Sequence, residues 1–278
     1  MRLLFVYSGA NSGTNQALLN AWRRDRHGCP IMGCDLGGGV QSLWGKLAAL
    51  PLALRRGGIG VLRPKSGNFT DAIKRSEWMM SRLSKTLQKR SHWTECDYDV
   101  VLGVGTTIPL AHCACPYFIY TDLTILANLY YPQGERQVEL WKECLPYERA
   151  NVAGARAVFT MSEHIGRSLR EHYRLPAERI VRVNAGCNGP RVNIYVPDRF
   201  KRMNILFIGV EWERKGGKEL EAAFRLVRSR LPNATLTVVG CRPVVAVGGI
   251  DVVGPVPPQR VGEYLARASV FCLPSPSY

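Results

Sequence analysis

The residues with the clearest chemical potential are two cations followed by two glycines, Arg214, Lys215, Gly216 and Gly217. They follow a strand-like apolar run, "NILFIGV" (204–210), and precede an amphipathic helical pattern. In an open parallel sheet, ligands bind beyond the carboxyl end of a strand and at the N-terminus of the next helix. Free N–H groups of that helix attract anions, and glycines allow close approach to the backbone. We therefore expect a diphosphate site at this loop.

A solvated surface turn is the alternative explanation of the same loop. Positive charges at a helix N-terminus oppose the helix macrodipole, so a plain turn would hold an unfavourable arrangement. A bound diphosphate removes that penalty, which favours the anion site. Two fixed cations can also stabilise negative charge that develops on a phosphate oxygen during a reaction. Because this chemistry requires no metal, we expect neither a metal nor a cofactor.

Length and charge limit the classes of function. The 278 residues suit two domains or one large α/β unit. The net charge is +15, and the segment 55–90 alone contains ten basic and two acidic residues. Such a field attracts phosphates, acidic sugars, nucleic acid or an anionic membrane. A basic polyanion or nucleic-acid binding module is therefore an alternative class, but few aromatic residues accompany the segment and no nucleic-acid motif is visible, so we expect no nucleic-acid partner.

The stretch 43–67 mixes apolar side chains with cations, as an interfacial membrane segment does. Pro51 is expected to break a long helix here, and an ordinary buried helix with a basic end is the alternative. No apolar run approaches the roughly 18 residues of a spanning helix, and the nine cysteines show no metal-ligand spacing. We expect a cytoplasmic protein and favour the buried helix for this stretch, with peripheral, salt-sensitive contact at the anionic inner face of the membrane as the less favoured alternative.

Short apolar runs followed by helical patterns predict βα units around a parallel sheet. Expected strands lie at 3–7, 98–104, 116–120 and 155–160, and after residue 200 at 204–210, 234–240, 250–256 and 269–275. A Pro/Gly/Asn-rich passage separates the two series. We expect an α/β protein with a complete N-terminal Rossmann-like domain (1–198) and the first half of a second one (199–278). The second has too few residues for a complete sheet, so the chain is expected to be cut short.

Five strings carry a resemblance to a known family. They are "FIGVEWERKGGKELEAAF" (207–224), "LPNATLTVVG" (231–240), "VVGPV" (252–256), "SVFCLPSPSY" (269–278) and the stretch from "ERANVAGARAVFTMSEHIG" to "VNAGCN" (148–188). Together they resemble the retaining family 4, or group 1, glycosyltransferases. The resemblance implies a GT-B fold of two facing Rossmann-like domains, the first on the acceptor side. It also implies sugar transfer from a nucleotide-diphosphate sugar to a glycan, lipid-linked or small-molecule acceptor.

In that family the Arg and Lys of the loop hold the donor diphosphate, a catalytic role that Arg214 and Lys215 match. The resemblance adds Gly216, Gly217 and Gly240 as substrate-binding positions. Many members carry an arginine where this sequence has Val210. The Glu-x₇-Glu motif of the family would start after residue 278, so we expect this chain to be inactive by itself. A nucleotide-sugar epimerase built on the same plan stays an alternative.

The first domain offers weaker candidates. "SGANSG" (8–13) resembles the glycine loop of the family, which implies substrate contacts at Gly9 and Gly13. Asp122 follows a strand where many members have His-Asp, with Thr121 in place of the histidine. Its carboxylate is expected either to accept a hydrogen bond from an acceptor hydroxyl or to cap the next turn, and capping is favoured. Ser162 is interpreted as a helix cap. Three histidines are interpreted as structural: His112, His164 and His172.

Overall fold

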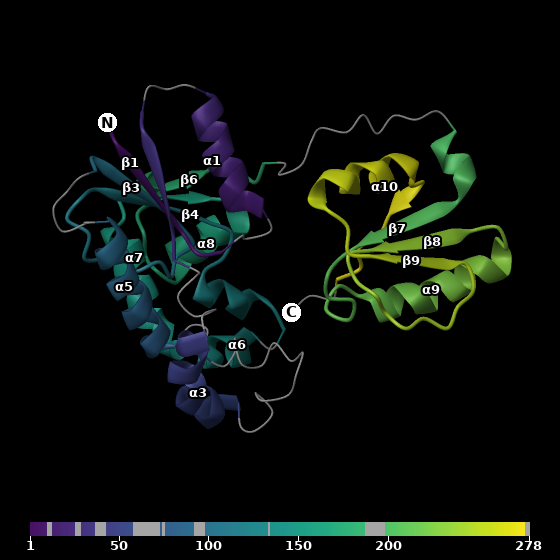
Figure 1. The fold of residues 1–278 in the computed structure, drawn as a ribbon, viewed down its shortest axis with the longest axis horizontal. Coiled ribbons are helices and arrows are strands. Elements are labelled where there is room, and N and C mark those ends of the chain that lie inside the picture. The colour runs from purple at the N-terminus through teal and green to yellow at the C-terminus, as the bar shows by residue number, and fades with distance from the viewer. Residues whose placement is uncertain are drawn as a thin grey trace. The chain divides into compact units, whose positions relative to one another are not determined.

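The computed structural model describes residues 1–9, 13–25, 29–36, 43–57, 73, 76–91, 98–132, 134–186 and 198–275. The chain divides into two compact units, residues 1–186 and 187–278 (Figure 1). Each unit has its own parallel sheet covered by helices. The fold class expected from the sequence, α/β with two Rossmann-like units, is thereby confirmed. The predicted division between residues 198 and 199 stays a prediction.

The first unit is built on a six-stranded sheet with the order β2-β1-β3-β4-β5-β6, and each pair is parallel. The strands are β1 (Leu3–Tyr7), β2 (Ile31–Asp35), β3 (Val100–Val104), β4 (Tyr117–Thr121), β5 (Ala157–Thr160) and β6 (Ile180–Arg182). β1, β3, β4 and β5 lie where the sequence predicts them, whereas β2 and β6 were not predicted. The order reverses between β1 and β3, so the carboxyl ends of these two strands form a switch point at which open sheets bind ligands.

Helices cover both faces of this sheet. They are α1 (Thr14–Arg24), α3 (Leu43–Gly57), α5 (Glu77–Ser91), α6 (Gly134–Leu140), α7 (Leu145–Gly154), α8 (Glu163–Glu171) and a 3₁₀ helix (Ile125–Tyr130). Successive strand residues face opposite sides. Phe5 of β1 packs with Leu19 of α1, whereas Leu4 and Val6 join the core formed by α3, α5, α7 and α8.

Helix α3 corrects one expectation about the apolar stretch 43–67. Pro51 lies inside this helix and does not break it. Ala49 and Ala53 are fully buried in the core of the first unit, so tertiary packing outweighs the hydrogen bond that proline removes. Residues 58–72, which hold much of the basic segment, lie outside the described residues. Within the described part of the chain, no helix combines the length and the apolar character that crossing a membrane requires.

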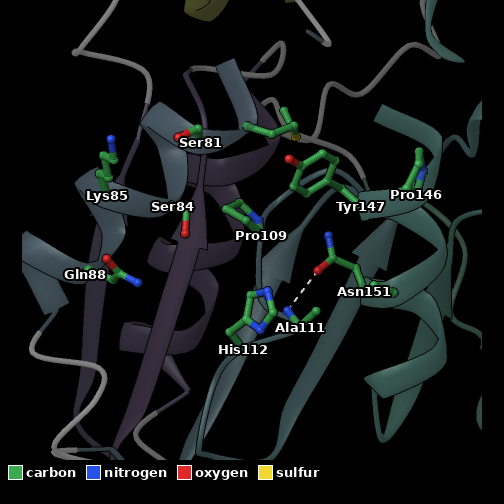
Figure 2. Close-up of a pocket in the computed structure, with 12 residues that line it drawn as sticks. Ser81, Ser84, Lys85, Gln88, Pro109, Ala111, His112, Pro146, Tyr147 and Asn151 are labelled. Atoms are coloured by element: carbon green, nitrogen blue, oxygen red, sulfur yellow. Dashed lines mark hydrogen bonds between the residues drawn. The ribbon is translucent and has the colours of Figure 1, made fainter. Parts of the chain in front are cut away.

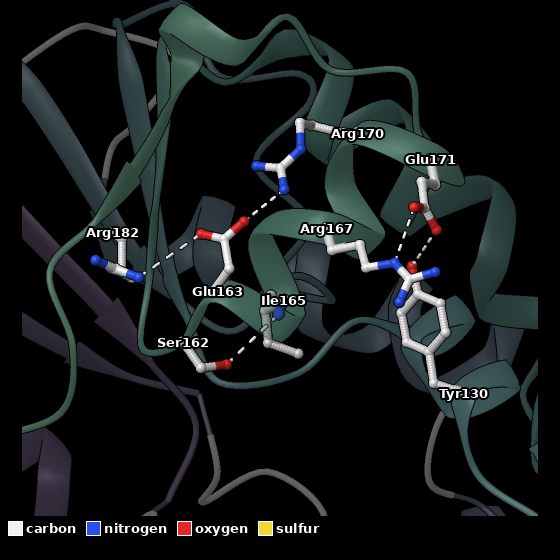
Figure 3. Close-up of polar contacts among 8 residues, drawn as sticks. All are labelled: Tyr130, Ser162, Glu163, Ile165, Arg167, Arg170, Glu171 and Arg182. Carbon is white, nitrogen blue, oxygen red and sulfur yellow. Dashed lines mark hydrogen bonds and ion pairs between the residues drawn. The ribbon is translucent and has the colours of Figure 1, made fainter.

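Helix α8 shows how local sequence fixes one element (Figure 3). The Ser162 hydroxyl accepts a hydrogen bond from the N–H of Ile165 at 3.4 Å, which confirms the predicted N-cap. Glu163 in the first turn pairs with Arg170 and Arg182, and its hydrogen bond from Arg170 is the main cause that lowers its pKa. These ion pairs are exposed to solvent, so they add little to the stability of the protein.

The second unit has a four-stranded parallel sheet with the order β10-β7-β8-β9. Its elements are β7 (Asn204–Ile208), α9 (Gly217–Arg230), β8 (Thr235–Val239), β9 (Ile250–Gly254), α10 (Val261–Arg267) and β10 (Val270–Phe271). All four strands and both helices lie where the sequence predicts them. The order reverses between β7 and β10, and the carboxyl end of β7 is therefore the switch point of this sheet.

The two faces of the second sheet bury different residues. Phe207 of β7 packs with Leu220 and Phe224 of α9. Its neighbour Leu206 faces the other side, where the core includes Ala268 and residues of α10. Figure 1 shows α9 and α10 on opposite sides of β7, β8 and β9. Because Phe207 and Leu206 are buried on opposite faces, the register of β7 is fixed, and so is the position at which the following loop begins.

Candidate functional site

The loop between β7 and α9 lies at the switch point of the second sheet. Its anchor is Trp212, whose ring meets the Phe207 ring at a centroid distance of 4.9 Å and an angle of 66°. The N–H of Lys215 donates to the Glu211 carbonyl at 3.0 Å, and the N–H of Gly217 donates to the Trp212 carbonyl at 2.8 Å. The loop is thus a hydrogen-bonded turn packed on the core, and these contacts hold the backbone of its cationic residues in place.

The cations of this loop differ in their partners. Arg214 pairs through its Nε with the carboxylate of Glu211, and Lys218 pairs with Glu213 at 2.7 Å. Lys215 is half-buried, its side chain runs alongside Gly209 at the end of β7, and its Nζ meets no acceptor among the described residues. The structure therefore brings both predicted cations to the switch point, but the uncompensated charge belongs to Lys215.

Helix α9 adds partial positive charge at the same place. Gly216 is its N-cap residue, and the N–H of Leu220 donates to the Gly216 carbonyl at 2.9 Å. The N–H groups of Lys218 and Glu219 meet no backbone acceptor in the part of the chain that the structure describes. Two amides and one ammonium group at one helix N-terminus are suited to an anion.

Gly216 and Gly217 are required by the packing of the protein itself. Gly216 has φ +75°, and a Cβ there would lie 1.9 Å from the carbonyl oxygen of Pro274. A Cβ on Gly217 would lie 2.1 Å from the Trp212 ring. Both glycines therefore have a structural reason that the sequence does not reveal. Their predicted contact with a substrate stays a prediction.

Replacing Gly216 by alanine is expected to lower the free energy of unfolding by about 2 kcal/mol or more. The alanine would have to adopt a left-handed backbone conformation, and its Cβ would also clash with the Pro274 carbonyl oxygen. Gly248 offers a matched control, since its φ is ordinary and a methyl group added there would meet no atom within 4 Å. Urea unfolding of both variants measures the difference. Equal stability of G216A and G248A would contradict the packing role of Gly216.

Two further residues lie at the carboxyl edge of the second sheet. Gly240, at the end of β8, has φ +100°, and a Cβ there would lie 2.7 Å from the Gly209 carbonyl oxygen. Arg242 follows it, and its guanidinium group lies beside Gly254 at the end of β9. Arg242 is exposed and forms no ion pair within the described ranges. Arg242 was not predicted, although a cation directly beyond a strand at this edge is a usable signal.

The glycine loop after β1 is only partly described, because residues 10–12 lie outside the described ranges. Gly9 has φ +69°, and its N–H donates to Asp35 Oδ1 at 2.9 Å. Gly13 has φ +85° and precedes α1. A Cβ on either glycine would meet no atom of the described residues within 4 Å. Asn15 is buried and donates to the Gly9 carbonyl at 2.7 Å, and this bond fixes the loop to α1.

Asp122 lies in a cavity of about 210 Å³ at the carboxyl ends of β3 and β4. The lining residues are Gly105, Thr106, Thr107, Thr121, Asp122, Leu123, Thr124, Ile125, Trp141 and Glu148. The favoured interpretation of Asp122 as a cap is wrong, because Thr124 caps the next 3₁₀ helix by accepting from the N–H of Ala127 at 3.2 Å. The Asp122 carboxylate is exposed and accepts no hydrogen bond from the described residues, so it is available to a ligand.

Glu148 forms the buried wall of this cavity. Its carboxylate accepts hydrogen bonds from the Thr106 hydroxyl, from the N–H of Ile125 at 3.0 Å and from the Tyr173 hydroxyl. Burial, followed by the charge of Glu148, raises the pKa of Tyr173, so this hydroxyl keeps its proton and donates. Glu148 therefore holds the loops after β3 and β4 in place beside Asp122. No sequence pattern identified this role.

Two histidines pack against tyrosine rings, and the described acidic residues form no metal-binding cluster. His164 packs against the rings of Tyr130 and Tyr131 at centroid distances of 5.0 and 5.3 Å, and His172 packs against Tyr130 at 5.1 Å. Their structural interpretation stays a prediction. Among the described residues, no cluster of three His, Cys, Asp or Glu side chains could hold a metal ion. One Asp-x-Asp sequence occurs at 97–99, and its second member, Asp99, accepts a hydrogen bond from the N–H of Arg2 at the amino end of the sheet.

Comparison with solved structures shows which known fold this chain resembles. No protein-family model and no curated protein sequence matches this chain. Among solved structures, a glycosyltransferase from Rickettsia africae ESF-5 matches 99% of this chain and 73% of its own, with TM-score 0.55 and 12% identity. A UDP-N-acetylglucosamine 2-epimerase matches 98% of this chain and 73% of its own, with TM-score 0.53 and 11% identity. The fold is GT-B-like.

A third solved structure shares this GT-B-like fold. It is MnaA of S. aureus solved with UDP, which matches 95% of this chain and 70% of its own, with TM-score 0.52 and 13% identity. At such low identity the likeness shows the fold alone.

Proposed function

We propose that this GT-B-like chain binds the diphosphate of a nucleotide sugar at the loop between β7 and α9, and that it is a retaining glycosyltransferase of the group 1 family. The observation that carries the proposal is Lys215, a half-buried cation without a partner among the described residues, at the switch point of the second sheet. The amides at the start of α9 and the guanidinium group of Arg242 add positive charge along the same edge. One solved structure of similar fold contains UDP, and another is a UDP-N-acetylglucosamine 2-epimerase.

The proposed chemistry divides between the two units. Lys215 stabilises the negative charge that develops on the leaving phosphate oxygen, and Arg214 joins it after exchanging Glu211 for a phosphate. On the carboxyl edge of the first sheet, the Asp122 carboxylate accepts a hydrogen bond from an acceptor hydroxyl. Lys215 and Arg214 can offset the negative charge of the leaving phosphate without a metal ion. The acceptor is a glycan, a lipid-linked molecule or a small molecule.

Calorimetric titration of this chain with nucleoside mono- and diphosphates tests the donor site. We expect one base to bind best, and its diphosphate to bind at least about tenfold more tightly than its monophosphate, because only the second phosphate completes the contact with the cationic loop. Equal affinities for the mono- and diphosphate would mean that the loop is a solvated turn. Absence of binding by every nucleoside diphosphate would overturn the proposal.

Epimerisation is the second candidate activity, because one of the similar solved structures is a UDP-N-acetylglucosamine 2-epimerase. The two activities give different products from the same donor. A transferase releases the nucleoside diphosphate in step with glycosylation of an acceptor, whereas an epimerase returns a nucleotide sugar with one inverted carbon. NMR of the sugar protons, with the protein at its natural length, separates them. Inversion without acceptor glycosylation would replace transfer by epimerisation.

A further inference from the structure

A second cavity of the first unit has no part in the proposed function. Its volume is about 480 Å³, and it lies between α5, the connection from β3 to β4, and α7 (Figure 2). The lining residues are Met80, Ser81, Ser84, Lys85, Gln88, Pro109, Ala111, His112, Pro146, Tyr147, Ala150 and Asn151. Ligand sites typically measure about 300–1,000 Å³, so a small molecule fits.

Polar side chains around this cavity are mostly without partners among the described residues. Ser81, Ser84 and Gln88 lie three and seven residues apart on α5 and so share one face of that helix. Their hydroxyl and amide groups form no hydrogen bond within the described part of the chain. Asn151 is the contrast, since both its Oδ1 and its Nδ2 are bonded to backbone groups. Ser81 and Gln88 are exposed and Ser84 is half-buried, so their donors are accessible to a ligand that enters the cavity from solvent.

The charge around the cavity favours an anion. Lys85 lies at the rim, His112 lies opposite α5, and the twelve lining residues include no aspartate or glutamate. Lys85 forms no ion pair with the described residues. The Tyr147 hydroxyl is protonated at neutral pH and can donate, and burial, followed by the charge of Glu77, raises its pKa further. Helix α5 is also the described end of the basic segment found in the sequence.

We propose that this cavity is a binding site for a small amphiphilic anion, a molecule with one carboxylate or phosphate group and a short apolar part. The apolar part lies on Met80, Pro109 and Ala150, and the anionic group meets Lys85 and the hydroxyl groups of α5. The site belongs to the first unit, whereas the diphosphate loop belongs to the second. Its occupation does not depend on the donor site.

Calorimetric titration of the full chain with octanoate, octyl phosphate and octanol tests this proposal. We expect one or both anions to bind at least about fivefold more tightly than octanol, since one exposed charge contact contributes on the order of 1 kcal/mol. The comparison of the two anions shows whether a carboxylate or a phosphate is preferred. Octanol binding as tightly as both anions would overturn the anionic part of the proposal, and no binding by any of the three would overturn it entirely.

Three variants locate the site. K85E is expected to weaken anion binding at least about fivefold, whereas K89E, which changes the same charge on the same helix outside the cavity, should change it less than about twofold. A150W is expected to abolish binding by filling the cavity, with folding checked by circular dichroism. Equal effects of K85E and K89E would mean that only the general field of the basic segment attracts the anion. Unchanged binding by A150W would exclude this cavity.

Discussion

Replacing Lys215 by alanine is expected to slow sugar transfer by the protein at its natural length more than about a hundredfold, which corresponds to roughly 3 kcal/mol of activation free energy. The reason is that Lys215 is the loop cation without a partner among the described residues, so its charge is available to the leaving phosphate. The same change should alter the free energy of unfolding by no more than about 0.5 kcal/mol, because its ammonium group supports no other described residue. Transfer rates and urea unfolding are measured side by side.

Lys218 provides the matched control for this experiment. It carries the same charge one residue inside α9, but its ammonium group is paired with Glu213 at 2.7 Å. K218A should therefore leave transfer within about threefold of the wild type, about 0.65 kcal/mol or less. If K215A transfers sugar at a near-normal rate, or if both variants lose the same activity, the loop is a solvated turn and the proposed diphosphate site is wrong.

The largest expected effect on stability comes from Asn151. Its Oδ1 accepts from the N–H groups of Leu110 and Ala111 at 3.0 and 2.9 Å, and its Nδ2 donates to the carbonyls of Thr106 and Ile108 at 3.0 and 2.6 Å. The side chain is 1% exposed. Replacing it by alanine leaves four backbone groups without their partner, and we expect a loss of roughly 4 kcal/mol in the free energy of unfolding, measured by urea denaturation.

Asn128 is a suitable comparison, because its Nδ2 makes one hydrogen bond, to the Ile125 carbonyl at 2.8 Å, in a half-buried position. N128A should cost about 1 kcal/mol. A loss of about 1 kcal/mol or less in N151A would mean that water replaces the amide and that the connection from β3 to β4 is held by other contacts.

The sequence predicts most of the fold because β1 is a continuous run of aliphatic and aromatic residues and β7 has such a run after Asn204. β2 was missed because "IMGCD" includes Gly33 and Asp35, which have low strand propensity. Packing does not require a glycine at this position, since a Cβ on the exposed Gly33 would make an ordinary van der Waals contact with Leu19 of α1 at 3.4 Å. The helix through Pro51 was missed for a related reason: burial of neighbouring alanines in the core outweighs a local propensity.

The candidate site could be predicted in position but not in detail. The place of Lys215 follows from the strand–loop–helix pattern, yet its isolation depends on which neighbours Glu211 and Glu213 choose as partners. The role of Asn151 could not be predicted, because its partners lie about forty residues away along the chain. Asp122 shows the same limit, since its predicted capping role is taken by Thr124.

The position of β10 beside β7 has a consequence for the order of events during protein synthesis. Contacts between these strands join segments 65 residues apart, as between Asn204 and Ser269, and such distant pairings form late in folding. Because Gly216 packs against the Pro274 carbonyl, the loop of Lys215 reaches its final shape only after β10 and the residues that follow it have left the ribosome and docked. The nascent chain therefore completes the loop of Lys215 only after β10 has paired with β7.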